Sequence, residues 1–350
     1  MDCFIISWLD FKIEIFYDQE FDLYNVSKYY FEPWYNVIKH DNIGKCQFRV
    51  EVKNDNYNNQ SLKGTSHKNI ILRGTKDPLW SITAKKYEYD DIELFEINER
   101  NAFVKLENKN KITLYSLLID TYIDTIVFRE LFVLIIDSII IKYAESIGGL
   151  LFHAAAFGSE QNANLIIGER GSGKTTTLLS AVKDKNNNCI SNDRCIIMLN
   201  NNGFMIYGLP YTINIRPESI SMFSEIDKHI NNINISPNDK IVLSHKDVIE
   251  NNIQCGMLSN ILLPNCKIPK ETKIYKILGN DASEYLYNSC HSYNNIKFND
   301  WHNIFLCKYN DQHKRSLITT ICNNIPIYYL DWGSDLVEKY NEIITNYCLY

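Results

Sequence analysis

Eight consecutive residues near the middle of the chain combine glycines, a lysine and a threonine in a spacing that suits phosphate binding. They fit the pattern G-x-x-x-x-G-K-[ST] of a phosphate-binding loop and read Gly168-Glu169-Arg170-Gly171-Ser172-Gly173-Lys174-Thr175. In such a loop the glycines let backbone N–H groups approach phosphate oxygens, the lysine reaches the β- and γ-phosphates, and the threonine hydroxyl binds Mg²⁺. A glycine-rich turn that fits by chance is the alternative. The length of the motif favours the first interpretation, so we predict that these residues and the adjacent Thr176 bind a nucleoside triphosphate.

The residues on either side predict the strand and the helix that such a loop needs. Residues 164–167 are short, apolar and typical of a buried strand, and residues 176–182 are typical of a helix. Phosphate oxygens are stabilised at a helix N-terminus by free N–H groups and by the partial positive charge of the helix dipole. The flanks therefore support the phosphate-binding interpretation.

A carboxylate and a histidine are the next candidates for chemistry. Residues 189–193 predict a short strand that ends on Asp193, and we expect it beside the strand of the loop, at the ligand-binding edge of the sheet. Asp193 could then take a proton from an attacking hydroxyl or help to hold Mg²⁺, and a purely structural role is the third alternative. His153 lies on the apolar strand predicted at 150–157, where it is either a core residue or a partner of Asp193 or the phosphates.

The bulk composition bounds the class of protein. The 350 residues are long enough for two domains, and 45% hydrophobic with 22% charged residues is an ordinary globular composition. A net charge of −6 disfavours nucleic acid as the main partner. The ten cysteines contain no C-x-x-C pair, which favours free thiols in a reducing cytoplasm. The most apolar stretch, 126–141, carries Arg129, Glu130 and Asp137, so we predict a buried helix there and no membrane span.

The remaining patterns divide the chain into two predicted domains, 1–146 and 147–350. Alternation of apolar and polar residues predicts that the first is β-rich, with a polar loop at 54–60. An aromatic cluster at 29–35 is expected to pack in the core or at a domain interface. Its strands are predicted at 11–17, 46–52, 69–72, 80–84, 102–106 and 112–115, and a helical stretch at 114–146 follows. In the second domain we predict a hairpin at 194–208, a strand that continues into a helix at 213–220, strands at 261–264 and 325–330, and helices at 282–289, 301–305 and 334–345.

Three segments together resemble a known kinase family. They are His153-Ala154-Ala155-Ala156, the loop at 168–175, and Ser191-Asn192-Asp193-Arg194. Over residues 148 to 348 the chain is similar to the catalytic domain of HPr kinase/phosphorylase. It is still more similar to the HPr-kinase-related kinases of peptide and natural-product biosynthesis, lasso-peptide kinases included. The resemblance implies an α/β fold, in which a P-loop kinase domain of the HPr kinase C-terminal type follows a smaller β-rich (α+β) domain.

The resemblance also implies roles for individual residues. Asp193 matches the proton acceptor of the family and His153 matches its active-site histidine, with ATP and Mg²⁺ as nucleotide and metal. The family has a basic residue past a proline-terminated strand, for which Lys267 and Lys270 are the candidates here, and Arg216 is another candidate for charge stabilisation. HPr kinases assemble as rings, which leaves a homo-oligomer open for this chain.

Three departures limit what the resemblance implies about the substrate. Asn192 stands where HPr kinases carry a second aspartate. The glutamate-isoleucine-arginine-glycine segment of those enzymes is not recognisable, and residues 1–112 do not resemble their N-terminal domain. HPr as acceptor and the reverse phosphorolysis are therefore not implied.

We predict a kinase that transfers the γ-phosphoryl group of ATP to a hydroxyl of a peptide serine or of a small biosynthetic metabolite. A nucleotide-dependent switch that is no kinase is the alternative, because the loop alone would allow it. The sequence has neither the N-K-x-D signature of GTPases nor the L-S-G-G-Q signature of ABC-type ATPases. A phosphoenolpyruvate carboxykinase-like enzyme ranks lower, since no metal-ligand set and no arginine cluster for an organic acid are visible.

Overall fold

The chain divides into two compact units. Unit 1 comprises Met1–Ile147 and Asn294–Lys308, and unit 2 comprises Gly148–Tyr293 and Tyr309–Tyr350. A segment that we expected in the second domain, Asn294–Lys308, thus groups with unit 1. The computed structural model describes residues 1–18, 22–39, 46–54, 66–73, 82–89, 92–97, 102–116, 122–183, 186–210, 212–215, 234–235, 241–266, 271–293, 301–331, 333 and 335.

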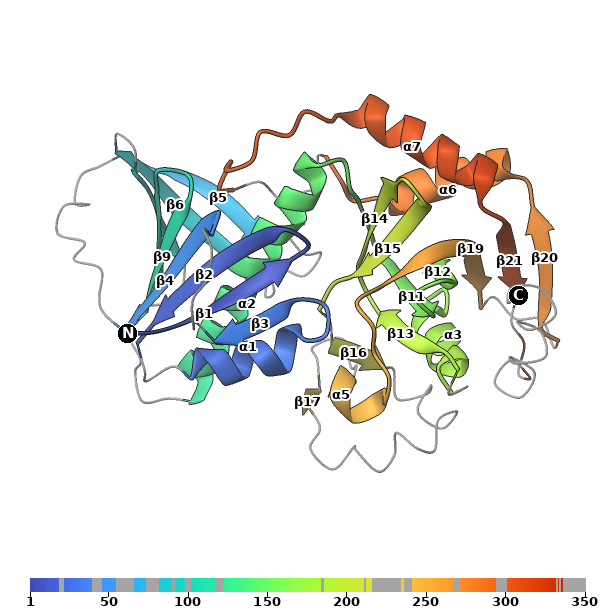
Figure 1. Ribbon diagram of the computed structural model, residues 1–350, viewed down its shortest axis with the longest axis horizontal. Helices are drawn as coiled ribbons and strands as arrows, with labels where there is room; N and C mark the ends of the chain where they lie inside the picture. Colours follow the sequence, from blue (N-terminus) through green and yellow to red (C-terminus); the bar gives the residue numbers. More distant parts are fainter. Residues whose placement is uncertain are drawn as a thin grey trace. The chain divides into compact units, whose positions relative to one another are not determined.

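Unit 1 is built on a nine-stranded sheet (Figure 1). The strand order is β3-β1-β2-β4-β9-β8-β7-β6-β5, and the pairs β2–β4 and β4–β9 are parallel while the others are antiparallel. Its strands are β1 Asp2–Trp8, β2 Phe11–Tyr17, β3 Asn36–Lys39, β4 Phe48–Asn54, β5 Lys68–Arg73, β6 Ile82–Tyr89, β7 Ile92–Ile97, β8 Ala102–Glu107 and β9 Lys111–Ser116. Its helices are α1 Leu23–Phe31 and α2 Tyr122–Ser146.

Alternating residues explain why these segments form strands. In β2 and β8 every second side chain is buried, as a strand with one covered face requires. The predicted strands at 11–17 and 69–72 and the hairpin at 102–115 are confirmed. Helix α2 begins at Tyr122, whereas 114–116 belong to β9, so the predicted start of the helix was too early. Of the predicted aromatic cluster, Phe31, Trp34 and Tyr35 are buried in the core, whereas Tyr29 is 50% exposed.

A histidine is buried in unit 1 beside helix α2. His302 is 1% exposed, and its ring packs against Trp301 with 4.9 Å between ring centroids. Burial and, to a smaller extent, the charge of Lys142 lower the pKa of His302 to about 3, against the opposing effect of a backbone hydrogen bond with Ser138. Because residues 301–305 form no helix in the structure, the helix predicted there was wrong. The segment was mistaken for a helix because Trp301 and Phe305 are spaced like one apolar face.

We expect this histidine to destabilise unit 1 as the pH falls. The unfolded chain binds a proton near pH 6.5 and the folded chain does so near pH 3, so the stability lost between them is about 1.4 kcal/mol per pH unit. The free energy of unfolding of wild type, measured with urea, should therefore be about 2 kcal/mol lower at pH 5 than at pH 7 through this group alone. His302→Gln should remove that part of the pH dependence. His67→Gln, at an exposed histidine of the same unit, should leave it, and equal slopes in all three proteins would contradict the assignment.

Unit 2 holds a second nine-stranded sheet of mixed direction. Its order is β10-β14-β15-β19-β12-β11-β13, with β21 paired to β19 and β20 paired to β21. Its strands are β10 Leu150–Phe152, β11 Ala154–Gly158, β12 Ala163–Ile167, β13 Asn188–Ser191, β14 Cys195–Asn200, β15 Gly203–Gly208, β19 Cys255–Asn265, β20 Lys273–Ile277 and β21 Ile327–Asp331. A three-stranded sheet comprises β16 Thr212–Ile215, β18 Ile241–Ser244 and β17 Asn234–Ile235.

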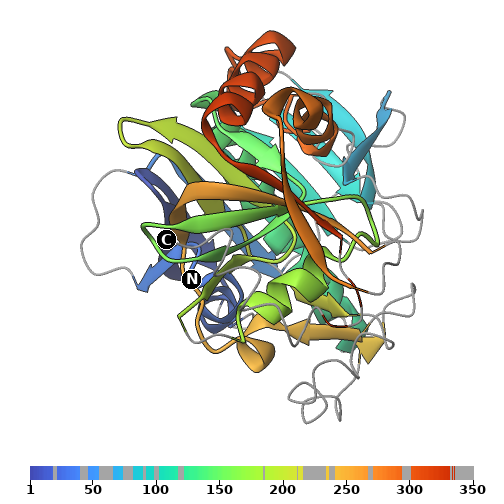
Figure 2. The same cartoon turned by 90° about the vertical axis from the view of Figure 1, so that its right-hand side faces the viewer.

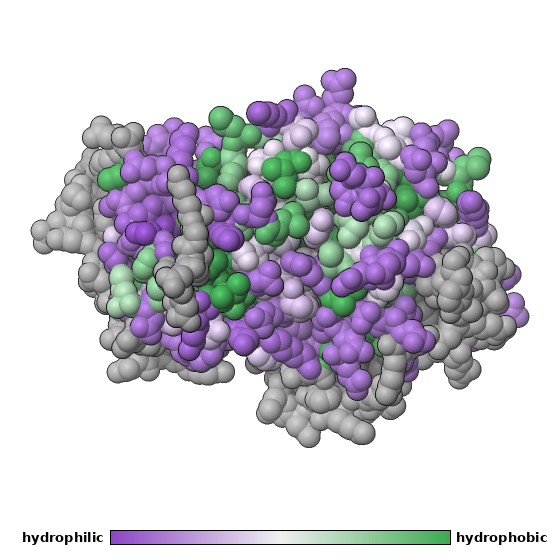
Figure 3. Space-filling model, viewed as in Figure 1, coloured by the Kyte–Doolittle hydropathy of each residue, from purple (hydrophilic) through white to green (hydrophobic). Residues whose placement is uncertain are grey.

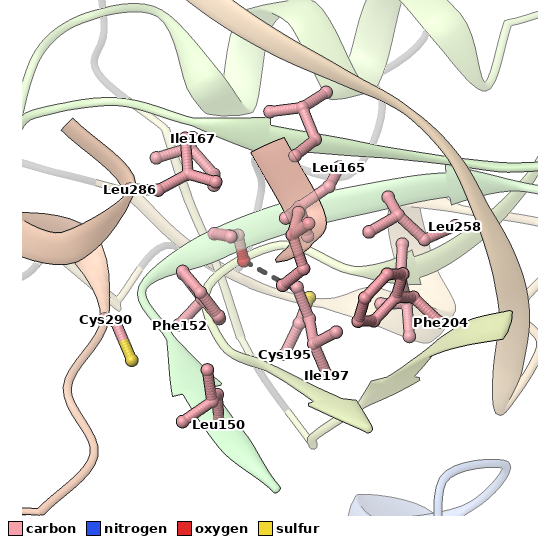
Figure 4. Close-up of a cluster of buried hydrophobic side chains, with 14 of the residues drawn as sticks. Leu150, Phe152, Leu165, Ile167, Cys195, Ile197, Phe204, Leu258, Leu286 and Cys290 are labelled. Carbon is pink, nitrogen blue, oxygen red and sulfur yellow. Dashed lines mark hydrogen bonds between the residues drawn. The ribbon is translucent and has the colours of Figure 1, made fainter. Parts of the chain in front are cut away.

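Helices cover both faces of the large sheet in unit 2. They are α3 Lys174–Ala181, α6 Gly279–Ser289 and α7 Asp311–Asn324, whereas α5 His245–Val248 packs on β18 of the three-stranded sheet. Helix α3 packs on β11 and β12, whereas α6 and α7 lie side by side over the other face (Figures 1 and 2). Leu165 and Ile167 of β12 point into the core beneath α6, together with Leu286 (Figure 4). The same close-up shows the Cys195 thiol donating to the Ala154 carbonyl at 3.6 Å.

The structure corrects several predicted elements of unit 2. The single strand predicted at 150–157 is two strands, β10 and β11, because His153 lies at a break where β10 turns to pair with β14 and β11 pairs with β12. Helix α7 was not predicted. Its exposed residues are polar, and its buried stripe is confined to Lys314, Leu317, Ile318, Ile321 and Cys322. The predicted strand at 325–330 is confirmed as β21, and the helix predicted at 334–345 lies outside the described residues.

The described surface is mainly hydrophilic on the face drawn in Figure 3, where hydrophobic residues lie in small groups. The helices of the described part of the chain include the 25-residue α2, and none of them combines the length and apolar character needed to cross a bilayer.

Candidate active site

The glycine-rich segment connects strand β12 to helix α3. Strand β12 ends at Ile167 and α3 begins at Lys174, so the segment lies in the strand–loop–helix context that the sequence predicts. Two of its glycines have backbone angles that L-residues rarely adopt, with φ of 86° at Gly171 and 100° at Gly173. The first backbone bond of α3 runs from Thr177 N to Gly173 O at 2.9 Å. The first turn of a helix presents backbone N–H groups in the position where an anion can bind.

Lys174 lies folded over the loop. Its Nζ donates to the backbone oxygens of Gly168, at 2.6 Å, and Glu169, at 3.1 Å, and the residue is only 9% exposed. In phosphate-binding loops the corresponding lysine contacts the phosphates instead. The side chain is thus held at the loop, within reach of a phosphate group that enters it.

Gly173→Ala is expected to weaken nucleotide binding. A Cβ at this left-handed residue costs about 1–2 kcal/mol of backbone strain, and relief of that strain turns the loop N–H groups away from the phosphates. We expect at least a roughly tenfold rise in the Kd for ATP by calorimetry, a loss of about 1.4 kcal/mol.

Gly203→Ala is the matched control for this substitution. Gly203 also has positive φ, at 128°, but lies in the β14–β15 hairpin with nothing within 4 Å of an added Cβ. Both variants should unfold more readily, and only Gly173→Ala should lose affinity. An equal affinity in the two variants would contradict a phosphate-binding role for the loop.

His153 and Asp193 form a pair at the break between β10 and β11. The Nδ1 atom of His153 lies 3.3 Å from Asp193 Oδ1 and 3.1 Å from the Asp193 backbone oxygen. Since both oxygens only accept, Nδ1 carries the proton that the pair shares. The backbone is fixed as well, because Ala154 N donates to Asp193 O at 3.1 Å. His153 is therefore a partner of Asp193, one of the two roles that the sequence left open for it.

The electrostatic environment keeps the Asp193 carboxylate ionised. Loss of hydration raises the pKa of Asp193, but the hydrogen bond and charge of His153 outweigh it. The positive charges of Arg194 and Lys174 lower the pKa of Asp193 further, to well below its ordinary value of 3.8. The Arg194 Nε atom lies 3.8 Å from Asp193 Oδ2, and its Nη2 donates to Pro210 O at 3.2 Å. The side chain of Asp193 is still 48% exposed, so a substrate or a metal ion can approach it.

Strand pairing brings the loop and the His153–Asp193 pair to one edge of the sheet. In the antiparallel pair β11–β12 Ala154 faces Ile167, so His153 and the start of the loop are at the same end. In the antiparallel pair β11–β13 Ala156 faces Ser191, which brings Asp193 to that end too. We expected β13 beside β12, but β11 lies between them. The intervening strand is the one that supplies His153.

Oxygen donors at this edge fit a magnesium ion. The candidates are the Asp193 carboxylate and the hydroxyl of the half-buried Thr175 in the first turn of α3. Beside Asp193, the buried Oδ1 of Asn192 has no hydrogen-bond partner. Mg²⁺ prefers oxygen ligands and takes one or two from protein in nucleotide sites, with phosphates and water completing its shell. Across the described residues no group of three or more His, Cys, Asp or Glu side chains forms a metal cluster.

The remaining predicted site residues are buried, exposed or outside the described residues. Thr176 is on α3 and 7% exposed, so its side chain faces the protein. Glu169 and Arg170 are exposed in the loop. Lys267, Lys270 and Arg216, the candidates for charge stabilisation, lie outside the described residues.

Three residues near the site were not predicted. Cys266, after β19, donates its thiol to the Gly171 oxygen, and Tyr285 of α6 contacts the backbone of Glu169, with burial raising the pKa of its phenol. The ring centroid of His291 lies 5.9 Å from that of His153. No motif joins these residues to the loop, since His291 follows His153 by more than a hundred residues. Only the fold brings them together.

Comparison with known proteins finds structural likenesses and no match at the level of sequence. No protein-family model matches the sequence, and no curated protein matches it. Among solved structures, the Hpr(Ser) kinase/phosphatase from Coxiella burnetii is similar at a TM-score of 0.28 and 10% sequence identity. The match covers 56% of this chain and 94% of that one.

Proposed function

We propose that this chain is a kinase that transfers the γ-phosphoryl group of ATP to a hydroxyl, on a peptide serine or on a small biosynthetic metabolite. The observation that carries the proposal is the meeting of the 168–175 loop and the His153–Asp193 pair at one sheet edge. A phosphate cradle alone serves many nucleotide-binding proteins, whereas an ionised carboxylate beside it supplies what hydroxyl transfer needs in addition. The resemblance of these segments to HPr-kinase-related kinases supports the same proposal.

The residues of the site supply different parts of the proposed reaction. Backbone N–H groups of the loop and the Lys174 ammonium bind the β- and γ-phosphates and stabilise the charge that develops during transfer. Asp193 accepts the proton of the attacking hydroxyl, and His153 orients its carboxylate. Mg²⁺, when bound through Thr175 and Asp193, would neutralise charge on the phosphate oxygens. The candidates Lys267, Lys270 and Arg216 would add positive charge beside the transferred group.

The experiment is a phosphoryl-transfer screen. Purified full-length chain, ATP and Mg²⁺ are incubated with serine-containing peptides, peptides that end in serine, nucleosides and sugar acids, and products are found by mass spectrometry. A phosphorylated product that is absent with Lys174→Met would support the kinase and identify the class of its acceptor. Tight ATP binding with no product across a panel of this breadth would contradict the proposal and favour a nucleotide-dependent switch.

A further inference from the structure

The C-terminal end of helix α6 is fastened to the strand break that carries His153. His153 N donates to Ser289 O at 3.1 Å, His291 N donates to Leu151 O at 2.6 Å, and Phe152 forms an isolated antiparallel bridge with Cys290. Leu151 N in turn donates to Ser292 Oγ at 2.6 Å. Residues 289–292 therefore run along residues 151–153 as an extra, short strand, and the backbone of His291 is held on both sides.

Helix α7 packs against residues 289–292, which we call the clip. Lys314 is 8% exposed, and its Nζ donates to the Cys290 carbonyl at 2.7 Å. The ring of Tyr287 lies 4.0 Å from the same ammonium and shields it. This charge-assisted hydrogen bond from a buried lysine holds the Cys290 carbonyl in place and so fixes the turn that follows α6. The side chain of His291 thus projects from a rigid segment.

The clip places the imidazole of His291 against the imidazole of His153. The ring centroids are 5.9 Å apart and the planes are inclined by 62°, an edge-to-face contact. His153 itself is 35% exposed and is anchored to Asp193 only through Nδ1. Without a neighbour across its face, such a ring can rotate and exchange the atom that meets the carboxylate. A ring packed against it restricts that rotation, as supporting residues do for histidines in metal and catalytic sites.

We propose that His291 is a positioning residue, whose ring holds the His153 ring with Nδ1 turned toward Asp193. The kinetic part of this inference rests on the proposed kinase function, while the orientation of His153 is a property of the fold. His291 acts here through the shape of its ring, so an aromatic ring without nitrogen should replace it, whereas a small side chain should not.

Two substitutions test the proposal by activity. His291→Ala removes the ring, and we expect kcat to fall about 10- to 100-fold with the KM for ATP unchanged, the cost typical of losing a residue that orients a functional histidine. His291→Phe should restore kcat to within a few-fold of wild type. His313→Ala is the matched control, since His313 is a half-buried histidine of the same unit that packs on Tyr309 instead. Wild-type kcat in His291→Ala, or a kcat in His291→Phe as low as in His291→Ala, would overturn the proposal.

A spectroscopic measurement tests the orientation without any substrate. In protein labelled with ¹⁵N-histidine, the neutral His153 ring of wild type and of His291→Phe should give the signature of the Nδ1–H tautomer, because both partners of Nδ1 are acceptors. His291→Ala should give a mixture of the two tautomers, with backbone signals still those of the folded chain. An unchanged tautomer in His291→Ala would overturn the proposal. If wild type transfers no phosphate at all, the kinase proposal fails, and this measurement still decides the role of His291.

Discussion

Lys174→Met is expected to lower kcat/KM for phosphoryl transfer by about 100- to 1,000-fold, the effect of removing one preorganised donor from a charged transition state. The ammonium group is held over the loop by the oxygens of Gly168 and Glu169 and is 9% exposed, so it is already close to where phosphates would lie. Methionine keeps the length and apolar stem of the side chain but removes its charge. The loss should appear in kcat and in the affinity for ATP, measured by steady-state kinetics and calorimetry.

Lys183→Met is the control for this prediction. Lys183 follows the same helix α3, and its side chain is exposed. The net charge changes equally in both variants, so any general electrostatic effect on ATP binding is common to them. We expect Lys183→Met to keep wild-type kcat and Kd. A Lys174→Met protein that is folded and fully active would show that the loop does not bind the transferred phosphate.

The strands and the loop could be predicted from the sequence because their signals are local. Strand β2 alternates buried and partly buried residues along its whole length, and the loop between β12 and α3 has a motif with fixed spacing. Helix α7 gave no such signal, since its N-cap Asn310 and its short buried stripe are separated by polar residues. A local sequence pattern predicts a helix or strand only when the apolar residues of its buried face make up much of the segment.

The neighbours of the candidate site could not be predicted, because they depend on pairings between distant segments. His153 stands at the break between β10 and β11, and the sequence showed only one continuous apolar run there. The order β12-β11-β13 is decided by sheet register, which single-strand patterns do not contain. His291 reaches His153 through the clip after α6. The residue types of the site were therefore predictable, while the contacts that orient them were not.

The roles left open for Asp193, proton acceptor or magnesium ligand, predict different results for the same substitution. Asp193→Asn should lower kcat by about 100- to 10,000-fold if the carboxylate takes the proton of the acceptor hydroxyl, because an amide is no base. ATP binding and the Mg²⁺ concentration at half-maximal rate should then stay near wild type. Loss of a metal ligand would instead raise that Mg²⁺ concentration. Asp281→Asn, at an exposed carboxylate on α6, controls for the change in charge and should leave kcat and the Mg²⁺ concentration at half-maximal rate unchanged.

The pH dependence supplies an independent test of the same residue. The pKa of Asp193 is lowered below its ordinary 3.8, so the carboxylate stays ionised as the pH falls from 8 toward 5, and its protonation should cause no loss of kcat/KM in that range. The ionised carboxylate also stabilises the folded state, and this contribution is present above about pH 4 and is lost as the pH falls below that value. His153→Ala removes the hydrogen bond and the charge that lower this pKa. The acid limb of kcat/KM should therefore move upward in His153→Ala, and a limb that does not move would separate His153 from the ionisation of Asp193.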